Sequence, residues 1–144
     1  MTLDHDEVSA RLDIMNLIAR IAHLADEGEV NEYLDCFTAN GAWVLNSAQG
    51  LDLEPQIRRG RADLAQGVLE RRESNLQGPG SHTKHDVSSI SVAVVGDSAT
   101  ATTYFRYYRK TDSVPELVAM GRYDDEFVRT GEGWRLTIRS ISRN

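Results

Sequence analysis

The spacing of apolar residues changes once along this chain, and that change constrains the fold more than any other feature. Before the Gly- and Pro-containing stretch 77–81, apolar side chains recur at steps of three and four, which is typical of amphipathic helices. After it they recur at steps of two, in segments rich in Val, Ile, Thr, Tyr and Phe, which is typical of strands. Helices followed by a run of strands predict an α+β fold.

Three helices are expected in the first half of the chain, over residues 6–26, 30–37 and 60–74. Gly28 separates the first two. A turn is expected at Asn40-Gly41, then a strand over 42–45 and an irregular stretch over 46–55.

The second half predicts four long strands, over residues 85–95, 98–110, 116–129 and 134–141. The connections 96–97 and 130–133 are short enough for hairpins, so these strands should form an antiparallel meander. Strands this long twist and curl. We therefore expect a cone-shaped, mostly antiparallel sheet with the three helices on its concave side and an open mouth.

Length and charge narrow the function classes. A chain of 144 residues is expected to form a single domain, 1–144. Its net charge of -6, with no basic stretch interleaved with aromatics, argues against nucleic acid as a partner. The acidic start of the chain and the lack of a long apolar run predict a cytoplasmic protein without a membrane partner. Cys36 is the only cysteine, which excludes an internal disulfide.

Histidines are the first candidates for proton transfer, because the ordinary pKa of this residue type lies near neutrality. Of the four in the chain, His82 and His85 lie where the 77–81 loop enters the first long strand, within reach of a ligand at the mouth of a cone. His85 lies further in and is the preferred candidate. His23 on the first helix is the second choice, and a purely structural role remains open for each.

Asp26 is the expected partner of His85. It falls at the end of the first helix, where its charge adds to the negative end of the helix dipole. A buried carboxylate facing His85 would accept its ring N–H and fix its tautomer, leaving the other nitrogen free to take a proton. The structural alternative is a solvated helix end.

Other chemistries are less well supported by the sequence. His82 and His85 would point to opposite faces of a strand, so a metal site is not expected. The chain has no Gly-rich phosphate loop, nucleophile elbow or Cys-His pair, so we expect no cofactor and no covalent catalysis.

The lining of the cavity is harder to assign. Tyr104, Arg106 and Tyr108 share one row of a strand, opposite the row of Phe105 and Tyr107, and parity alone does not say which row faces inward. The candidate substrate-binding residues are Tyr104, Arg106, Tyr108, Ser89 and Trp43.

A series of loose motifs, in order and over essentially the whole chain, resembles one family. They are IARIAHLADEG (18–28), LDCFTANGAW (34–43), GR (60–61), HTKH (82–85), VVGDSA (94–99), GRYDDEF (121–127) and GWRL (133–136). The chain thus resembles the SnoaL-like branch of the nuclear transport factor 2-like superfamily, the branch of scytalone dehydratase and hexachlorocyclohexane dehydrochlorinase.

The resemblance implies a general-base dyad, because Asp26 and His85 match the dyad positions of several enzymes in this group. It implies a cofactor-independent lyase or isomerase, dehydratase-like, acting on a small cyclic, largely apolar substrate. Two positions depart from the pattern. Ile21 stands where dehydratases often have a tyrosine, and Ser89 replaces an asparagine.

The resemblance also allows a non-catalytic function. The same cone serves as the small subunit of aromatic ring-hydroxylating dioxygenases, where a dyad would have no catalytic use. In either case the resemblance implies a homodimer or homotrimer.

Overall fold

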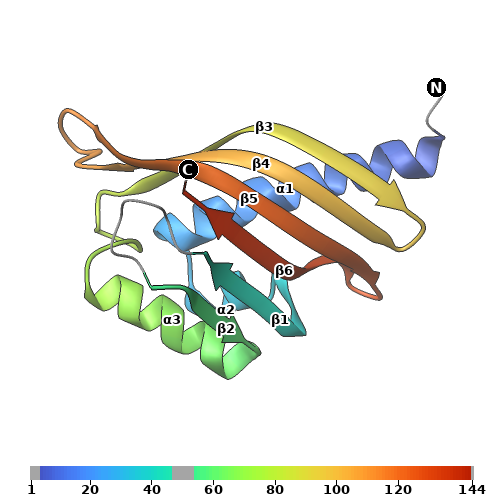
Figure 1. Ribbon diagram of the computed structural model, residues 1–144, viewed down its shortest axis with the longest axis horizontal. Helices are drawn as coiled ribbons and strands as arrows, with labels where there is room; N and C mark the ends of the chain where they lie inside the picture. The colour runs from blue at the N-terminus through green and yellow to red at the C-terminus, as the bar shows by residue number, and fades with distance from the viewer. Residues whose placement is uncertain (1–3, 47–53, 144) are drawn as a thin grey trace.

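A computed structural model describes residues 4–46 and 54–143 of the chain (Figure 1). The elements are α1 (His5–Glu27), α2 (Val30–Leu34), β1 (Phe37–Leu45), β2 (Gln56–Arg59), α3 (Arg61–Glu73), β3 (Lys84–Val95), β4 (Ser98–Arg109), β5 (Glu116–Thr130) and β6 (Gly133–Ser142). The α+β prediction is confirmed, with the helices preceding the long strands.

The strands form one six-stranded sheet in the order β2-β1-β6-β5-β4-β3. Strands β3 to β6 pair antiparallel in sequence order, so the predicted meander is confirmed. β1 runs parallel to β6, and β2 pairs antiparallel with β1 at the edge. This order places β3, which carries His85, at the opposite edge of the sheet.

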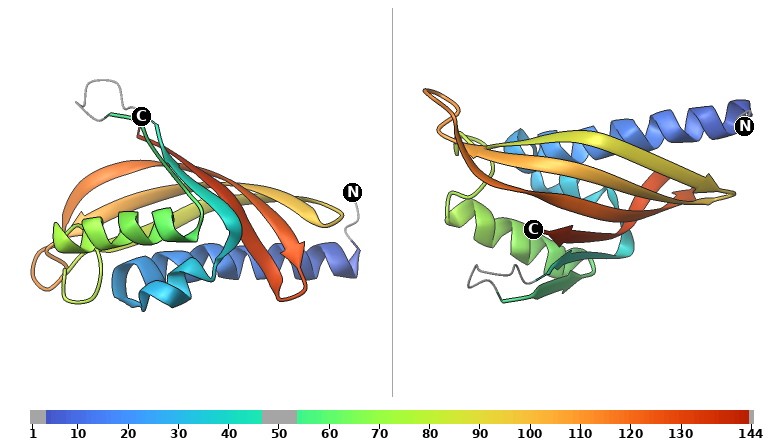
Figure 2. Two further views of the ribbon diagram at one scale, coloured as in Figure 1. Left: turned by 90° about the horizontal axis from the view of Figure 1, so that it is seen from below. Right: turned by 45° about the horizontal axis from the view of Figure 1, so that its top comes forward.

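The sheet is curved, and all three helices lie on its concave side (Figure 2). The largest fully buried apolar side chains lie between these layers: Ile14, Ile18, Ile21, Val68 and Leu136. Burying such side chains is the main source of stability for the assembly of helices and sheet. The expected cone with helices on its concave side is confirmed.

Local sequence fixes both ends of α1. The Asp4 carboxylate accepts a hydrogen bond from the Glu7 backbone N–H at 2.7 Å, which caps the first turn. At the other end a Cβ on Gly28 would lie 2.8 Å from the backbone Cα of Leu24, so a side chain does not fit where the chain leaves the helix. Asp26 is thereby placed in the last turn of α1.

Two boundaries predicted around β1 are wrong. Phe37 begins β1 instead of ending a helix, because it pairs with Leu136 of β6 and is buried there. Asn40 and Gly41 lie inside β1, at a register shift between Phe37 and Ala42, and form no turn. Tertiary pairing overrides the local helical spacing here.

The edge strand β2 was not predicted. Its four residues pair with Ala42 to Leu45 of β1, and three of the four are exposed, so no apolar alternation marks them in the sequence. The irregular stretch predicted over 46–55 lies mostly outside the described residues.

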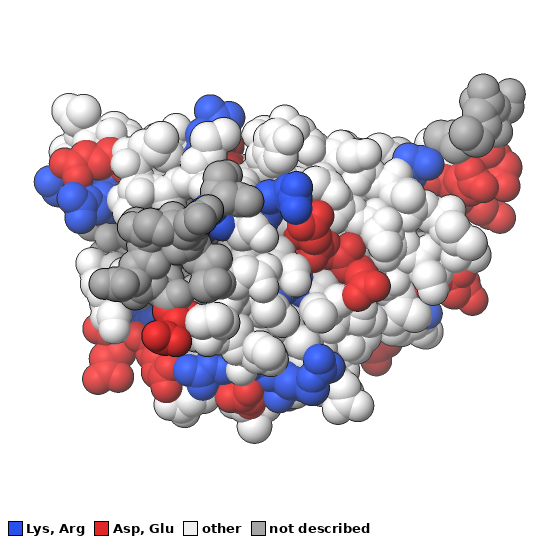
Figure 3. Space-filling model, in the orientation of Figure 1, with Lys and Arg blue, Asp and Glu red and all other residues white. Residues whose placement is uncertain are grey.

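Acidic and basic side chains are interspersed over the face shown in Figure 3. On that face the basic groups of the described residues form no single continuous patch.

Candidate active site

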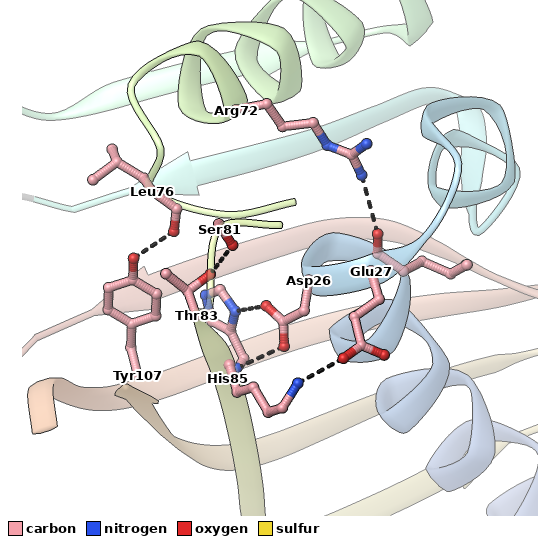
Figure 4. Close-up of polar contacts among 10 residues, drawn as sticks. Asp26, Glu27, Arg72, Leu76, Ser81, Thr83, His85 and Tyr107 are labelled. Atoms are coloured by element: carbon pink, nitrogen blue, oxygen red, sulfur yellow. Dashed lines mark hydrogen bonds and ion pairs between the residues drawn. The ribbon is translucent and has the colours of Figure 1, made fainter. Parts of the chain in front are cut away.

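Asp26 and His85 lie in contact, 59 positions apart in the sequence (Figure 4). Oδ1 of Asp26 is 2.7 Å from Nδ1 of His85, and Oδ2 accepts the backbone N–H of His85 at 2.8 Å. The carboxylate side chain is 6% exposed and the imidazole 18%. Because both oxygens bind the same residue, the carboxylate fixes the position and the orientation of the ring.

The contact also determines where the imidazole proton lies. An ionised carboxylate only accepts hydrogen bonds, so Nδ1 of a neutral His85 carries the proton. Nε2 has no hydrogen-bond partner among residues 4–46 and 54–143. One face of the ring packs against Tyr107, with the ring centroids 5.0 Å apart. The arrangement leaves Nε2 as an acceptor, in a ring that lines the cavity between the helices and the sheet.

An ion pair beside the dyad ties α1 to β3. Nζ of Lys84 is 2.6 Å from Oε1 of Glu27, and both side chains are exposed (Figure 4). The hydrogen bond from Lys84 and its positive charge lower the pKa of Glu27, and the bond to Glu27 raises the pKa of Lys84. The pair joins α1 to β3 at the surface, next to Asp26 and His85 in the sequence.

Hydroxyl groups anchor the loop that precedes β3. The Tyr107 hydroxyl donates to the Leu76 carbonyl, and the hydroxyls of Ser81 and Thr83 lie 2.7 Å apart in a buried position (Figure 4). Burial raises the pKa of Tyr107. The phenol is therefore a neutral donor that holds the loop against β4, next to His85.

His85 faces a cavity of about 370 Å³ between the helices and the sheet. Its wall is largely apolar and aromatic, with Ile21, Trp43, Phe105, Tyr107, Tyr123 and Ile141 among the lining residues. A cavity of this size and lining is typical of small-molecule sites.

A second buried carboxylate lies deeper in the same cone. Asp125 and Arg139 form two hydrogen bonds of 2.9 Å, and their side chains are 0% and 5% exposed. The guanidinium carbon of Arg139 lies 3.9 Å from the ring centroid of Tyr123. Burial raises the pKa of Tyr123, so this phenol stays neutral.

The structure brings some of the predicted residues to the cavity and not others. Trp43 lines it. Tyr104 and Arg106 lie on the opposite row, where Tyr104 is 46% exposed and Arg106 faces Asp86 at 3.9 Å. The row of Phe105 and Tyr107 faces inward instead, so the expectation that Tyr104 and Arg106 line the cavity is wrong.

Tyr108 and Ser89 also lie away from the cavity. Tyr108 lines a second hollow together with His23, and Asp26 and His85 also border this hollow. Ser89 is exposed at a β-bulge, with a φ of 52°. The bulge turns this side chain out of the strand's alternation, so Ser89 does not take the place of a polar lining residue.

The other histidine of the loop does not join the site. Nε2 of His82 is 3.7 Å from an Asp112 oxygen, and both side chains are more than half exposed. Within the described ranges, no group of three or more His, Cys, Asp or Glu side chains is arranged to hold a metal ion.

Several polar residues at the cavity were not singled out from the sequence. Tyr107 was expected there only as one of a group of aromatic residues, and Arg71 was not expected at all. Tyr107 pairs with His85 across β3 and β4, so strand register would have revealed it once the inward row was known. Arg71 reaches the cavity from α3. Nothing in the helical spacing distinguishes Arg71 from Arg72, so no sequence signal marked it.

Fold and site together define a helix-covered, curved-sheet protein with a small-molecule cavity and a buried His–Asp pair. The family model of the SnoaL-like domain matches residues 6–140, and the chain belongs to this family. No curated protein matches the sequence.

Solved structures share the fold at low identity. An NTF2-like protein with a cystatin-like fold from Novosphingobium aromaticivorans matches with a TM-score of 0.80 and 24% identity, over 96% of this chain and 84% of that one. The beta subunit of a putative aromatic-ring-hydroxylating dioxygenase from the same organism has a TM-score of 0.75 and 18% identity, over 98% and 92%. A Catenulispora acidiphila protein in complex with S-DNPA has a TM-score of 0.72 and 21% identity, over 94% of each chain.

None of the described helices combines the length and apolar character needed to cross a membrane.

Proposed function

We propose that this protein is a cofactor-independent lyase or isomerase of the dehydratase type, with His85 as general base and Asp26 as the residue that orients it. The observation that carries the proposal is the 2.7 Å contact between Asp26 and Nδ1 of His85, on the wall of an apolar cavity. A base within hydrogen-bond reach of an orienting carboxylate is the arrangement that proton abstraction requires.

The proposed reaction begins at Nε2 of His85. This nitrogen takes a proton from a carbon next to a carbonyl group of a cyclic substrate, and the electron pair of the broken C–H bond moves into the enolate. Asp26 stabilises the imidazolium that forms. The imidazolium then returns the proton, either to a leaving hydroxyl, which departs as water, or to another carbon, which shifts the double bond.

The size of each contribution can be bounded. A positioned general base contributes about 10²- to 10⁴-fold in rate. The remainder has to come from holding the substrate in a cavity shielded from water. Ile21, at the position where related dehydratases often have a tyrosine, offers no hydrogen bond, so another side chain has to stabilise the enolate oxygen.

The test is deuterium exchange into a panel of cyclic ketones and β-hydroxyketones in D₂O, followed by NMR. We expect His85→Gln to lower the exchange rate about 10²- to 10⁴-fold, with an unchanged melting temperature. His82→Gln is the matched control, because this histidine is exposed and lies three positions away. Equal exchange in the wild type and His85→Gln would refute the proposal.

A second candidate is a non-catalytic subunit, because the fold is shared with the beta subunit of a putative ring-hydroxylating dioxygenase. A filled cone would favour this role, whereas the open cavity beside His85 favours the enzyme. Under the subunit hypothesis, His85→Gln would leave assembly with a partner intact and no panel compound would exchange in the wild type.

We also propose a homodimer or homotrimer formed through the outer face of the sheet, in a cytoplasmic protein. Three large side chains on β4 and β5, Tyr104, Leu117 and Met120, are 46%, 54% and 55% exposed. Light scattering after size exclusion tests this association, and Met120→Lys should weaken it. A monomeric wild type would refute it.

A further inference from the structure

The cavity wall carries positive charge that the described acidic residues do not fully balance. Arg71, Arg139 and Arg143 line it, whereas its described lining includes no Asp or Glu. The charge of Arg139 is balanced by Asp125, which lies 2.9 Å from it. Arg143 lies beyond the end of β6. Arg71 and Arg143 are therefore the two lining cations without an ion pair among the described residues, and Arg71 is the one that a helix holds against an aromatic ring.

Arg71 is held by an aromatic ring, with its guanidinium carbon 4.6 Å from the ring centroid of Trp43. Glu70, the carboxylate on α3 whose charge acts on Arg71, is bonded to Arg58 at 2.5 Å. No ion pair between described residues includes Arg71. An aromatic face compensates a buried cation only in part.

Burial lowers the pKa of Arg71, and the neighbouring Tyr33 offsets part of that effect. A guanidinium nevertheless keeps its proton at neutral pH. Arg71 is thus a partly buried cation on the wall that also holds His85.

Gln77 is a second polar residue at the cavity whose side-chain donor has no hydrogen-bond acceptor among the described residues. Its side chain lines the same cavity, the residue is 6% exposed, and Nε2 has no acceptor among the described residues. Buried donors are normally satisfied. Donors in excess of acceptors indicate that the cavity is suited to a ligand that brings oxygen acceptors and negative charge.

We propose that the substrate is a cyclic carboxylate, whose carboxylate group binds Arg71 while its ring lies in the aromatic part of the cavity and its reacting carbon faces His85. This inference rests on the proposed function, since it concerns the same site. A planar guanidinium binds a carboxylate through two parallel hydrogen bonds, and one negative charge balances the one charge of Arg71.

Equilibrium binding tests the inference without any turnover. Isothermal titration calorimetry compares 2-naphthoate with 2-naphthamide, which share a ring and differ in charge. We expect the wild type to bind the carboxylate about tenfold more tightly, as a charge-assisted bidentate contact would provide. Arg71→Met should abolish the preference, and Arg71→Lys should keep part of it.

Arg61→Met is the matched control. This arginine lies on the same helix, is half exposed and pairs with Asp35 at 2.8 Å, so the variant should keep the full preference. Equal affinity for the two compounds in the wild type, binding of neither, or a preference that survives in Arg71→Met would overturn the inference. If circular dichroism shows that Arg71→Met does not fold, the affinities of the wild type and of Arg71→Lys for the two compounds test the inference instead.

The carboxylate preference should persist in His85→Gln. A loss of exchange activity in that variant therefore reports on the general base, whereas a loss of preference in Arg71→Met reports on the substrate class. The two proposals can fail separately.

Discussion

The described part of the cone contains two buried carboxylates, each bound to a basic side chain, and the two pairs differ in whether a polar atom stays free. Asp125 binds Arg139 through two bonds of 2.9 Å, and both side chains are almost fully buried. Asp26 binds the ring and the backbone of His85, but the imidazole is 18% exposed and its Nε2 has no partner among the described residues.

This difference separates a stabilising pair from a reactive one. A guanidinium has no lone pair to take a proton, so the pair of Asp125 and Arg139 can hold the sheet together but cannot act as a base. An imidazole oriented through one nitrogen keeps a second nitrogen for chemistry. The same carboxylate chemistry therefore serves the fold at one place and, in our proposal, the reaction at the other.

The largest effect is expected from breaking the deeper pair. Asp125→Asn leaves Arg139 buried without a counter-ion, which should lower the free energy of unfolding by about 3–5 kcal/mol. Urea unfolding followed by circular dichroism measures this. Replacing both members, by Asp125→Leu and Arg139→Met, should recover most of the loss. An Asp125→Asn variant as stable as the wild type would show that the pair of Asp125 and Arg139 does not stabilise the fold, which is the role that distinguishes it from the pair of Asp26 and His85.

A smaller effect is expected from high pH, and it should arise in the same deep region. Burial raises the pKa of Tyr33 and of Tyr123 above the ordinary value of 10.0. Below pH 10 both phenols are neutral in the folded and in the unfolded chain. Above it the unfolded chain loses these protons first, so stability should fall as the pH rises.

Urea unfolding between pH 9 and pH 11 tests this sign. Tyr123→Phe should flatten the fall, because it removes one of the two buried phenols. A stability that stays constant, or rises, up to pH 11 would show that these phenols ionise as freely in the fold as in the unfolded chain.

The smallest effect is expected on the outer face of the sheet. Arg106 faces Asp86 at 3.9 Å, with both side chains more than 40% exposed. Arg106→Gln should change the free energy of unfolding by less than about 1 kcal/mol and leave exchange activity unchanged, since this row faces away from the cavity. A large loss of exchange activity in Arg106→Gln would contradict our proposal that the reaction takes place on the concave side of the sheet.

Much of the fold could be predicted from periodicity, because α1, α3 and the long strands bury continuous apolar faces. The short edge strand β2 could not, since three of its four residues are exposed. Phe37 was assigned to a helix because its spacing fits one, whereas its pairing with Leu136 is a long-range contact that no local pattern contains.

In the site, too, some residues could be predicted from the sequence and others depend on long-range packing. Asp26 and His85 stood out through their positions at a helix end and a strand start, and through the family resemblance. The row of β4 that faces inward did not stand out, because alternation defines two rows without saying which one meets the helices. The placement of Arg71 over Trp43 joins α3 to β1 and depends on packing between two elements.

The most direct test of the central claim is the tautomer of His85, read from ¹⁵N NMR of its ring above neutral pH. We expect a proton on Nδ1 and a bare Nε2, with that preference weakened in Asp26→Asn because a neutral amide holds the Nδ1 proton less strongly than a carboxylate. A proton on Nε2 in the wild type would contradict the claim, because the nitrogen on the cavity side would then be unable to act as the base.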